Sequence, residues 1–397
     1  MATENNNKNL NVPNLRFPEF SGEWAKTTLG KIGNTFNGLT GKSGADFGQG
    51  SPYITYKSIF DSSRIDLSRV EFVTITDQER QKETQNKVQF GDIFFTTSSE
   101  TPEEVGMTSV LLDDIEDCYL NSFCFGYRLF AKDKTLPEYM RFYLRNQAIR
   151  KKLFVLAQGS TRFNISKGEV MNVSVLLPET DEQEKIAKLL SLLEERINTQ
   201  IKIIEDLKKL KSAISNEIFD HTSNRKCELK EIASVIMGQS PSSHAYNNNA
   251  EGLPLIQGNL DIENGQLSPR IYTSEITQTC ECGDVILTVR APVGEIAIAQ
   301  QEACIGRGVC SIRPHVKNDT NLIYQFLQYF KPKWGSLEQG STFTAVSGTD
   351  IRGIAVSIPS ADKIELLNVY DNKIRVESRI LTNLTQQKQY LLAQMFI

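Results

Sequence analysis

The two halves of this 397-residue chain contain the same series of short sequence landmarks in the same order. Five pairs of segments correspond: Thr28–Ile32 (TLGKI) with Glu228–Ile232 (ELKEI), Gly50–Ile54 (GSPYI) with Gly252–Ile256 (GLPLI), Gly91–Thr96 (GDIFFT) with Gly283–Thr288 (GDVILT), Gln158–Thr161 with Gln339–Thr342 (QGST in both), and Val173–Pro178 (VSVLLP) with Ile354–Pro359 (IAVSIP). Chance produces one or two such matches, but five in the same order indicate a duplication. Each copy is far longer than a solenoid repeat, so we expect two copies of one domain.

Within each copy, short runs typical of β-strands alternate with turn residues. Examples are SPYITY, DIFFTT and FCFGYRLF in the first copy, and DVILTV and GVCSIR in the second. One helix is predicted over Pro137–Phe154, because a Pro begins it and apolar residues follow at helical spacing. Its counterpart is predicted over Asn321–Tyr329. The fold class is therefore mixed α/β (α+β) in both copies.

Each copy closes with a long segment that has the pattern of a coiled coil. Residues 181–219 lack Pro and Gly, and a heptad frame fits them, with apolar residues at eight of ten core positions. The two polar exceptions are Gln200 and Lys211. The last segment fits the same frame, with Glu377 and Lys388 as exceptions, through Leu367, Tyr370, Ile374, Leu381, Leu384, Leu391 and Met395.

A helix of this length, about 60 Å at about 1.5 Å per residue, needs a partner for its apolar stripe. We expect the two long helices to pack antiparallel on each other and to hold the two globular domains apart. The alternative is that each helix covers only its own domain. The domain boundaries predicted on this basis are a disordered polar tail at 1–20, a first domain at 21–178, a central helix at 179–222, a second domain at 223–359 and a C-terminal helix at 360–397.

Composition excludes several classes of protein. No apolar run approaches the roughly 20 residues that span a bilayer, and the Asn-rich start lacks the apolar region of a signal peptide, so a cytoplasmic protein is expected. The seven Cys are scattered, and Cys280 and Cys282 have no partner pair at zinc spacing. We therefore expect reduced thiols and no metal site. The net charge of −4 disfavours a protein that coats nucleic acid non-specifically, but it permits local basic surfaces.

The usual catalytic motifs are missing from the chain. The GKS at Gly41–Ser43 lacks the Gly that a P-loop places five positions earlier, because Phe36 stands there. We find no methyltransferase motif for a flipped base, no nuclease-like pair of carboxylates with a lysine, and no activated Ser or Cys. A duplicated chain with none of these motifs is more typical of a binding protein than of an enzyme.

The order of the landmarks resembles one known family. Trp24 with LGKI, then GDIF, QGSTRFNIS, LLPETDEQEKIAKLL and a long helix ending in LKKLKSAISNEIF are similar to the specificity subunits of type I restriction-modification systems, from Trp24 to Ile397. The most specific part is Pro178–Ala187, with its Glu-Gln and Lys-Ile-Ala. The second copy departs from the pattern: PSADKIELLNVY lacks the Glu-Gln pair, and QGSTFTAVS lacks counterparts of Arg162 and Asn164.

The resemblance implies a non-catalytic protein with two target-recognition domains, each of which reads one half of a bipartite site in double-stranded DNA. The helices would act as a spacer and as the docking site of two modification subunits, which methylate adenine with S-adenosylmethionine. Restriction subunits would add cleavage driven by ATP and Mg. The residues expected to form the coiled coil and to dock partners are Ile186, Leu190, Leu193, Ile197, Ile204, Leu207, Ile374, Leu381, Leu384 and Leu391.

Base recognition requires side chains that can form hydrogen bonds with base edges from loops or strand ends. The candidates in the first copy are Lys42, Ser43, Lys57, Arg162 and Asn164. In the second copy they are Gln239, Ser240, Gln257, Asn259, Arg290, Arg307 and Thr342. Arg150, Lys151 and Lys152, at the end of a predicted helix, could contact phosphates or interact with the helix C-terminus.

Two other function classes remain open from the sequence. One is a nuclease or methyltransferase with unrecognised motifs, which would modify DNA without other subunits. The other is a structural coiled-coil adaptor, which would bind no DNA duplex even beside methyltransferase subunits. Neither the DNA target nor the spacer length follows from the residues, because recognition also depends on loop geometry and DNA shape.

Overall fold

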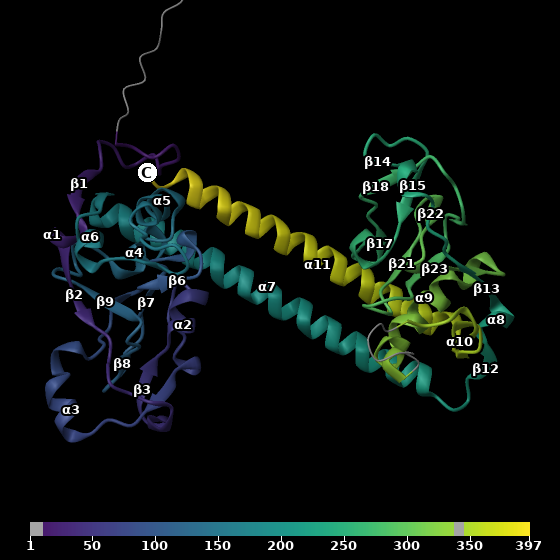
Figure 1. Ribbon diagram of the computed structural model, residues 1–397, viewed down its shortest axis with the longest axis horizontal. Coiled ribbons are helices and arrows are strands. Elements are labelled where there is room, and N and C mark those ends of the chain that lie inside the picture. Colours follow the sequence, from purple (N-terminus) through teal and green to yellow (C-terminus); the bar gives the residue numbers. More distant parts are fainter. Residues whose placement is uncertain (1–10, 337–344) are drawn as a thin grey trace, which may run out of the picture. The chain divides into compact units, whose positions relative to one another are not determined.

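Residues 11–336 and 345–397 are described by the computed structural model (Figure 1). They fall into two units: unit 1 consists of Met1–Asn198 and Thr382–Ile397, and unit 2 of Thr199–Leu381. Each unit contains one copy of the duplicated sequence together with parts of both long helices. The predicted mixed α/β fold with two repeated domains and two long helices is confirmed.

Unit 1 has a four-stranded sheet in the order β2-β9-β5-β7, a three-stranded sheet in the order β4-β3-β8, and two short ribbons, β1-β11 and β6-β10. Its strands are β1 (Ala25–Thr28), β2 (Gly33–Asn37), β3 (Phe47–Ile54), β4 (Glu71–Val73), β5 (Ile93–Thr96), β6 (Ser98–Ser99), β7 (Thr108–Val110), β8 (Tyr119–Leu120), β9 (Cys124–Leu129), β10 (Phe163–Asn164) and β11 (Ser174–Leu177). Its short helices are α1 (Leu29–Ile32), α2 (Tyr56–Asp61), α3 (Asp77–Lys82), α4 (Pro137–Tyr143), α5 (Gln147–Val155) and α6 (Lys167–Met171).

Unit 2 has a six-stranded sheet in the order β13-β23-β20-β21-β17-β16, a five-stranded sheet in the order β14-β18-β15-β22-β19, and the ribbon β12-β24. Its strands are β12 (Arg225–Glu228), β13 (Ala233–Met237), β14 (Tyr246–Asn247), β15 (Leu253–Ile256), β16 (Ile262–Glu263), β17 (Gln266–Leu267), β18 (Ile271–Thr273), β19 (Thr279–Cys280), β20 (Val285–Thr288), β21 (Ile296–Ile298), β22 (Ala303–Ile305), β23 (Val309–Pro314) and β24 (Ala355–Ile358). Its short helices are α8 (Leu229–Ile232), α9 (Thr320–Phe330) and α10 (Gly348–Arg352).

The central strand of each unit contributes side chains to two hydrophobic cores. In β5, Ile93 and Phe95 pack into one core, whereas Phe94 packs into another. In β20, Val285 and Leu287 likewise pack into one core and Ile286 into another. Successive side chains of a strand point to opposite faces of the sheet, so an uninterrupted apolar run indicates a strand that is covered on both faces. The GDIFFT and GDVILT landmarks therefore correspond to equivalent strands.

The predicted single helix at Pro137–Phe154 is wrong, because the structure divides it into α4 and α5. The side chain of Asn146 accepts a hydrogen bond from the backbone N–H of Ile149 at 2.9 Å and caps the start of α5. Asn favours this position over a helix interior, because its side chain satisfies an N–H that the new helix leaves free. The predicted counterpart, Asn321–Tyr329, lies within α9.

The long helices are α7 (Thr180–Asp220), with 41 residues, and α11 (Ala361–Gln394), with 34 residues. Every predicted core position of both helices is buried or half-buried. Within unit 2, Gln200 Nε2 lies 2.6 Å from Glu377 Oε2, and Lys211 Nζ lies 2.6 Å from Asp371 Oδ1. These two pairs run in opposite directions along the two helices, so the segments pack antiparallel, as predicted.

The polar exceptions in the heptad pattern are thus paired across the seam. In unit 1, Lys388 Nζ lies 2.6 Å from Glu194 Oε1, and burial together with nearby Arg side chains lowers the pKa of Lys388. In unit 2, hydrogen bonds from Lys373 and Gln200 lower the pKa of Glu377. A polar core position costs stability but specifies the register of a coiled coil. Among the helices of the described residues, none is both long and apolar enough to cross a membrane.

Candidate functional site

The turn Asn121–Cys124, between β8 and β9, lies at the centre of a set of loops at one end of the unit 1 sheets. The backbone N–H of Leu39 donates to Leu120 O at 2.7 Å, which places the loop after β2 beside this turn. Thr97 N–H donates to Phe123 O at 3.0 Å, so the end of β5 joins it. β10 pairs with β6 just beyond Thr97. We call this set of loops the loop edge of unit 1.

Unit 2 has the same arrangement around the turn Gly306–Val309, between β22 and β23. Gln239 N–H donates to Ile305 O at 2.9 Å, and Val289 N–H donates to Gly308 O at 2.9 Å. These bonds match those of Leu39 and Thr97 in unit 1. We call these loops the loop edge of unit 2. The duplication therefore extends from the sheets to the loops between them.

The structure brings the six described candidates of the second copy together at the loop edge of unit 2. Ser240 Oγ accepts a hydrogen bond from the backbone N–H of Arg307 at 3.1 Å, and the side chain of Gln257 donates to the Tyr246 hydroxyl at 3.0 Å. Asn259 begins the 3-10 helix η6 (Asn259–Asp261), two residues after Gln257. Gln239 is exposed on the loop beside Ser240. Thr342 lies outside the described residues.

Two arginines of this edge are exposed in the part of the chain that the structure describes. Arg290 follows β20 and bridges to Ala345, and Arg307 stands in the turn itself. Both are exposed, and neither side chain has a hydrogen-bond or ion-pair partner among residues 11–336 and 345–397. A guanidinium held in solvent on a short turn can donate to base edges or to phosphates.

In unit 1, the structure places three of the five candidates at the loop edge. Lys57, Arg162 and Asn164 are exposed there, with Asn164 opposite Ser98 in the β10-β6 ribbon. Lys57 occupies the position of Asn259, because Ile54 and Ile256 pair in the same way with the parallel strands β8 and β22. Their role as base contacts remains a prediction.

The other two candidates of unit 1 are engaged within the chain. Lys42 Nζ lies 2.7 Å from the carboxylate of Glu79, and its side chain is almost fully buried. Glu79 is also part of the cap of α3, and the bond from Lys42 together with those from Thr76 lowers its pKa to about 2. Ser43 caps the 3-10 helix η1 (Gly44–Asp46), where its Oγ lies 2.9 Å from Asp46. Both residues hold the loop after β2 in place.

Arg150 has neither of the roles that the sequence suggested for it. Its terminal nitrogens donate to the carbonyl oxygens of Glu103, Val105 and Gly106 at 2.6–2.7 Å, and burial lowers its pKa to about 10. Lys152 Nζ donates to Ser174 O at 2.8 Å. Lys151 is exposed. Arg150 is therefore a structural residue that anchors the loop before β7.

Two exposed apolar residues at the loop edges were missed from the sequence. Phe123 lies in the turn of unit 1 and is 59% exposed, and Leu260 lies in η6 of unit 2 and is 66% exposed. An apolar residue in a sequence is normally assigned to the core. In the structure, Phe123 instead faces solvent at the tip of a turn between two strands.

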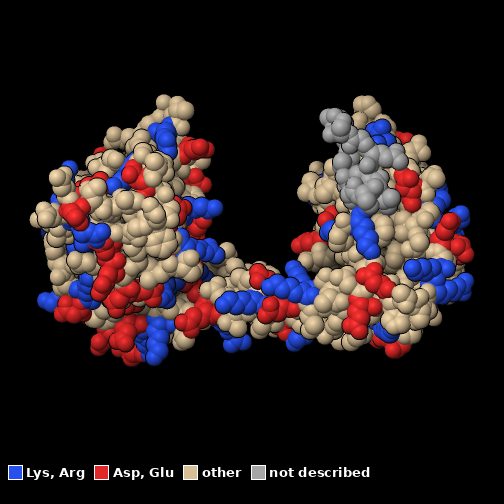
Figure 2. All heavy atoms as spheres, turned by 90° about the horizontal axis from the view of Figure 1, so that it is seen from below, with Lys and Arg blue, Asp and Glu red and all other residues tan. Residues whose placement is uncertain are grey.

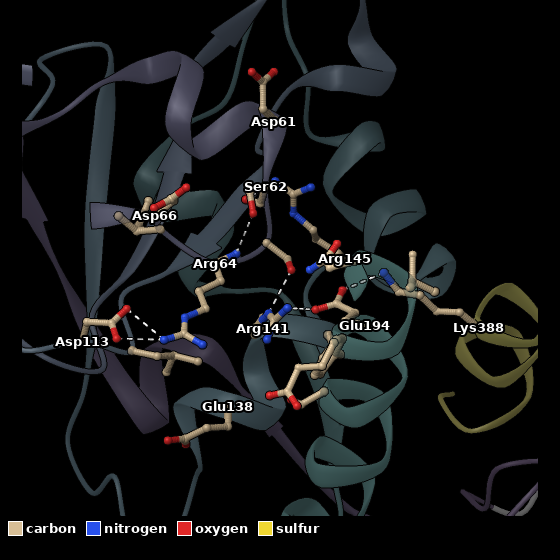
Figure 3. A pocket seen from close by; sticks show the side chains of 18 of the residues that line it. Asp61, Ser62, Arg64, Asp66, Asp113, Glu138, Arg141, Arg145, Glu194 and Lys388 are labelled. Atoms are coloured by element: carbon tan, nitrogen blue, oxygen red, sulfur yellow. Dashed lines mark hydrogen bonds and ion pairs between the residues drawn. The ribbon is translucent and has the colours of Figure 1, made fainter. Parts of the chain in front are cut away.

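A cavity in unit 1 has a volume of about 1000 Å³ and is lined mainly by polar residues (Figure 3). Five of its charged groups form ion pairs: Arg64 lies 2.8 Å from Asp113, and Glu194 pairs with both Arg141 and Lys388. Arg145 donates to four backbone carbonyls, and burial lowers its pKa to about 10. This network ties α4 to α7 and α11 within unit 1. The residues that line the cavity therefore have a structural role, which is to hold these helices together.

Charges of both signs are interspersed on the face of each unit that Figure 2 draws. Figure 2 shows Lys and Arg beside Asp and Glu over the face drawn, without a continuous basic surface on either unit. Within the described residues, no three His, Cys, Asp or Glu side chains are placed to hold a metal ion. On the face drawn, local loops are therefore the candidate contacts for a polyanion.

The predicted docking residues of the long helices, Ile186 to Leu391, are all buried or half-buried. Apolar side chains that are free to meet a partner lie elsewhere on α7 and α11. They are 38–60% exposed and comprise Leu192, Ile201, Ile203 and Leu210 on α7, and Leu366, Val369, Val376 and Tyr390 on α11. Exposed apolar residues that recur along a helix are typical of a surface that another protein covers.

Comparison with known proteins finds similarity to one family over most of the chain. The family model described as the type I restriction modification DNA specificity domain matches twice, at residues 21–209 and 224–386. A protein of Methanocaldococcus jannaschii, named as the type I restriction enzyme MjaX specificity subunit, is 27% identical over an alignment of 412 residues that covers 97% of this chain and 95% of the relative. The MjaVIII specificity subunit of the same organism is 23% identical and covers 67% of this chain and 71% of its own length.

Solved structures share the fold. The type I restriction-modification S subunit from M. genitalium has a TM-score of 0.63 at 16% identity and covers 97% of this chain and 99% of its own. A chain from a study of the assembly and conformational transition of a type I system has a TM-score of 0.59 at 22% identity, with 94% and 97% covered. At these identities, the likeness concerns the fold alone.

Proposed function

The chain belongs to the type I restriction modification DNA specificity family, and on this premise we propose that its two units each read one half of a bipartite site in double-stranded DNA through their loop edges. The units would contribute recognition without catalysis. The restriction-modification complex would supply the chemistry through its other subunits.

One observation supports this proposal above the others: the two loop edges have the same backbone arrangement but carry different side chains. The turns Asn121–Cys124 and Gly306–Val309 are held by equivalent hydrogen bonds, yet the first presents Ser122 and Phe123, and the second Arg307. A conserved scaffold with different loop side chains is what two half-sites of different sequence require, because backbone contacts fix position whereas base contacts specify sequence. An asymmetric DNA site follows from it.

We further propose that two modification subunits dock on the outer faces of α7 and α11. The seam residues are buried in contacts within the chain, so the exposed apolar residues from Leu192 to Tyr390 named above are better candidates. S-adenosylmethionine would be bound by the modification subunits, and ATP and Mg would be used by restriction subunits. In this arrangement the present chain binds no cofactor.

The function is tested by exchanging one unit. Residues 25–177, from the start of β1 to the end of β11, would be replaced by the same segment of another family member, and the methylated sites of a host would be sequenced. We expect one half of the methylated motif to change and the other half to remain. The matched variant replaces residues 225–358, from β12 to β24, and should change the opposite half.

A result in which both halves change, or neither does, would contradict the two-reader model. Methylation of DNA by the purified chain alone would instead identify an enzyme. Absence of binding to any duplex in the presence of modification subunits would identify a structural adaptor. A chain with a net charge of −4 should bind DNA weakly alone, because phosphate contacts provide much of the affinity.

A further inference from the structure

The turns at the centres of the two loop edges correspond residue by residue. Asn121 N–H donates to Ile54 O at 3.0 Å, and Gly306 N–H donates to Ile256 O at 2.8 Å. Across each turn, Cys124 N–H donates to Asn121 O at 3.0 Å, and Val309 N–H donates to Gly306 O at 3.1 Å. Ser122 therefore corresponds to Arg307, and Phe123 to Gly308.

The turn of unit 1 holds an aromatic ring in solvent. The side chain of Asn121 accepts from the Phe123 N–H at 2.8 Å. The carbonyl of Phe123 accepts from the N–H of Thr97 at 3.0 Å and from its hydroxyl at 2.6 Å. The backbone is thus fixed on both sides of a ring that is 59% exposed. A rigid, exposed apolar side chain loses little conformational entropy when it binds and gains from each apolar atom that it covers.

The turn of unit 2 presents a different group. At Gly308, a Cβ atom would overlap the carbonyl oxygen of Gln257, so no side chain fits at the position of Phe123. Arg307 is the side chain at the tip, and its backbone N–H is held by Ser240 Oγ. Its guanidinium is exposed and has no partner among the described residues. A planar fork of N–H donors on a fixed backbone suits a pair of acceptors on one base edge.

We infer that this turn reads one base pair in each half-site, by apolar contact in unit 1 and by a forked hydrogen bond in unit 2. Phe123 would contact the 5-methyl group of a thymine in the major groove, the apolar group that distinguishes this base there. Arg307 would donate to O6 and N7 of a guanine, which present two acceptors side by side. The inference rests on the proposed function and adds the base class that each turn selects.

The experiment uses the assembled complex with modification subunits and duplexes that carry the motif obtained from methylome sequencing. In the half-site read by unit 1, each thymine is replaced in turn by deoxyuridine, which lacks only the 5-methyl group. At one position we expect binding to weaken about fourfold, the effect of one buried methyl group. Phe123→Ala should weaken binding to the natural duplex and should abolish the response to deoxyuridine.

Phe130 provides the matched control. It follows the end of β9 that is opposite to Phe123 and is 64% exposed, so Phe130→Ala removes an exposed phenyl ring at a distance from the loop edge. This variant should bind like the wild type and should keep the response to deoxyuridine. Loss of affinity in Phe123→Ala without any response of the wild type to deoxyuridine would overturn the methyl contact.

In the other half-site, each guanine is replaced in turn by 7-deazaguanine, which lacks the N7 acceptor. The wild-type complex should bind more weakly when one particular guanine is replaced. Arg307→Lys keeps the charge but not the forked pair of donors, so its preference for guanine at that position should fall by about ten- to a hundredfold. Equal weakening on all sequences would mark Arg307 as a phosphate contact and overturn the inference. If the wild-type complex methylates no bipartite motif, the proposed function itself fails, which is a distinct outcome.

Discussion

Arg128 donates from Nε and from one terminal nitrogen to the two carboxylate oxygens of Asp92, at 2.8 and 2.6 Å. Asp92 is fully buried, and its carboxylate also accepts from the Gln89 N–H at 2.8 Å. In unit 2, Arg313 binds buried Asp284 in the same way, at 3.0–3.1 Å, and this contact raises the pKa of Arg313. The Asp of the repeated Gly-Asp landmark is therefore an anchor between the central strand and its neighbour.

We predict that Asp92→Ala destabilises unit 1 by about 2–3 kcal/mol, because the guanidinium group of Arg128 loses its charged partner. Hydrogen exchange measured by mass spectrometry should show faster exchange in β5 and β9. The matched variant Asp284→Ala should affect β20 and β23 instead. Unchanged exchange in β9 of the first variant would show that the pair contributes little to stability.

The sequence predicted the duplication and the long helices because both depend on patterns that recur at fixed spacing. Gly91 and Gly283 illustrate this, since both have a positive φ, of 79° and 94°, which favours Gly and preserves the landmark. The split of the predicted helix at Asn146 was missed, because one capping side chain is a weak signal against a continuous apolar face.

The second prediction tests the ion pair between Lys42 and Glu79 through the titration of Glu79. The ammonium group of Lys42 and the cap of α3 lower its pKa to about 2, so the ionised form is favoured in the folded state. The stabilisation is fully present above the ordinary pKa of about 4.3 and is lost as the pH falls toward 2. In Lys42→Met, the carbon NMR titration of Glu79 should move upward toward 4.3. An unchanged midpoint would mean that Lys42 does not bind Glu79 in solution.

The same variant separates two roles for Lys42. A lysine that only supports the loop after β2 should leave the methylated motif unchanged when it is replaced. A change in one half of the motif would instead restore Lys42 as a base contact. The sequence could not distinguish these roles, because Glu79 lies 37 residues from Lys42 along the chain. A Lys and a Glu at that separation do not by themselves predict a contact.

The C-terminus completes the core of unit 1. The ring of Phe396 lies 5.7 Å from that of Tyr139 and 5.9 Å from that of Tyr143, measured between centroids. Phe396→Ala should destabilise unit 1 by about 3–5 kcal/mol through the cavity it leaves, seen as early proteolysis within residues 25–177. Phe219→Ala should act likewise on unit 2, where Phe219 packs against Phe326. Exposed Phe130→Ala is the control and should have little effect.

Loop residues were harder to predict than the helices, for a physical reason. Arg290 and Arg307 could be proposed as contacts because arginine can form forked hydrogen bonds with base edges and both lie beside short runs typical of β-strands. Phe123 could not, because its exposure depends on the hydrogen bonds that it accepts from Thr97 and donates to Asn121, which fix the turn. A contact surface that is assembled from several loops depends on pairing between strands that are distant in the sequence, and that pairing has no periodic sequence pattern.

The last prediction concerns the length of α7 and α11. If the helices set the distance between the half-sites, lengthening both of them should lengthen the preferred DNA spacer. The polar pairs Gln200–Glu377 and Lys211–Asp371 enclose residues 201–210 of α7 and residues 372–376 of α11. Seven residues inserted between Gln200 and Lys211, together with seven between Asp371 and Glu377, keep the heptad frame and both pairs. The insertion adds about 10.5 Å.

At about 3.4 Å per base pair, this length corresponds to roughly three base pairs, so methylome sequencing should find a spacer about three base pairs longer with both half-sites unchanged. The added base pairs also rotate one half-site about the DNA axis, so weaker methylation of the new sites is expected. Seven residues in α7 alone should disrupt the seam and abolish methylation. An active doubly extended variant with an unchanged spacer would show that the helices do not set the distance. A change in the half-site bases would show instead that the helices take part in recognition.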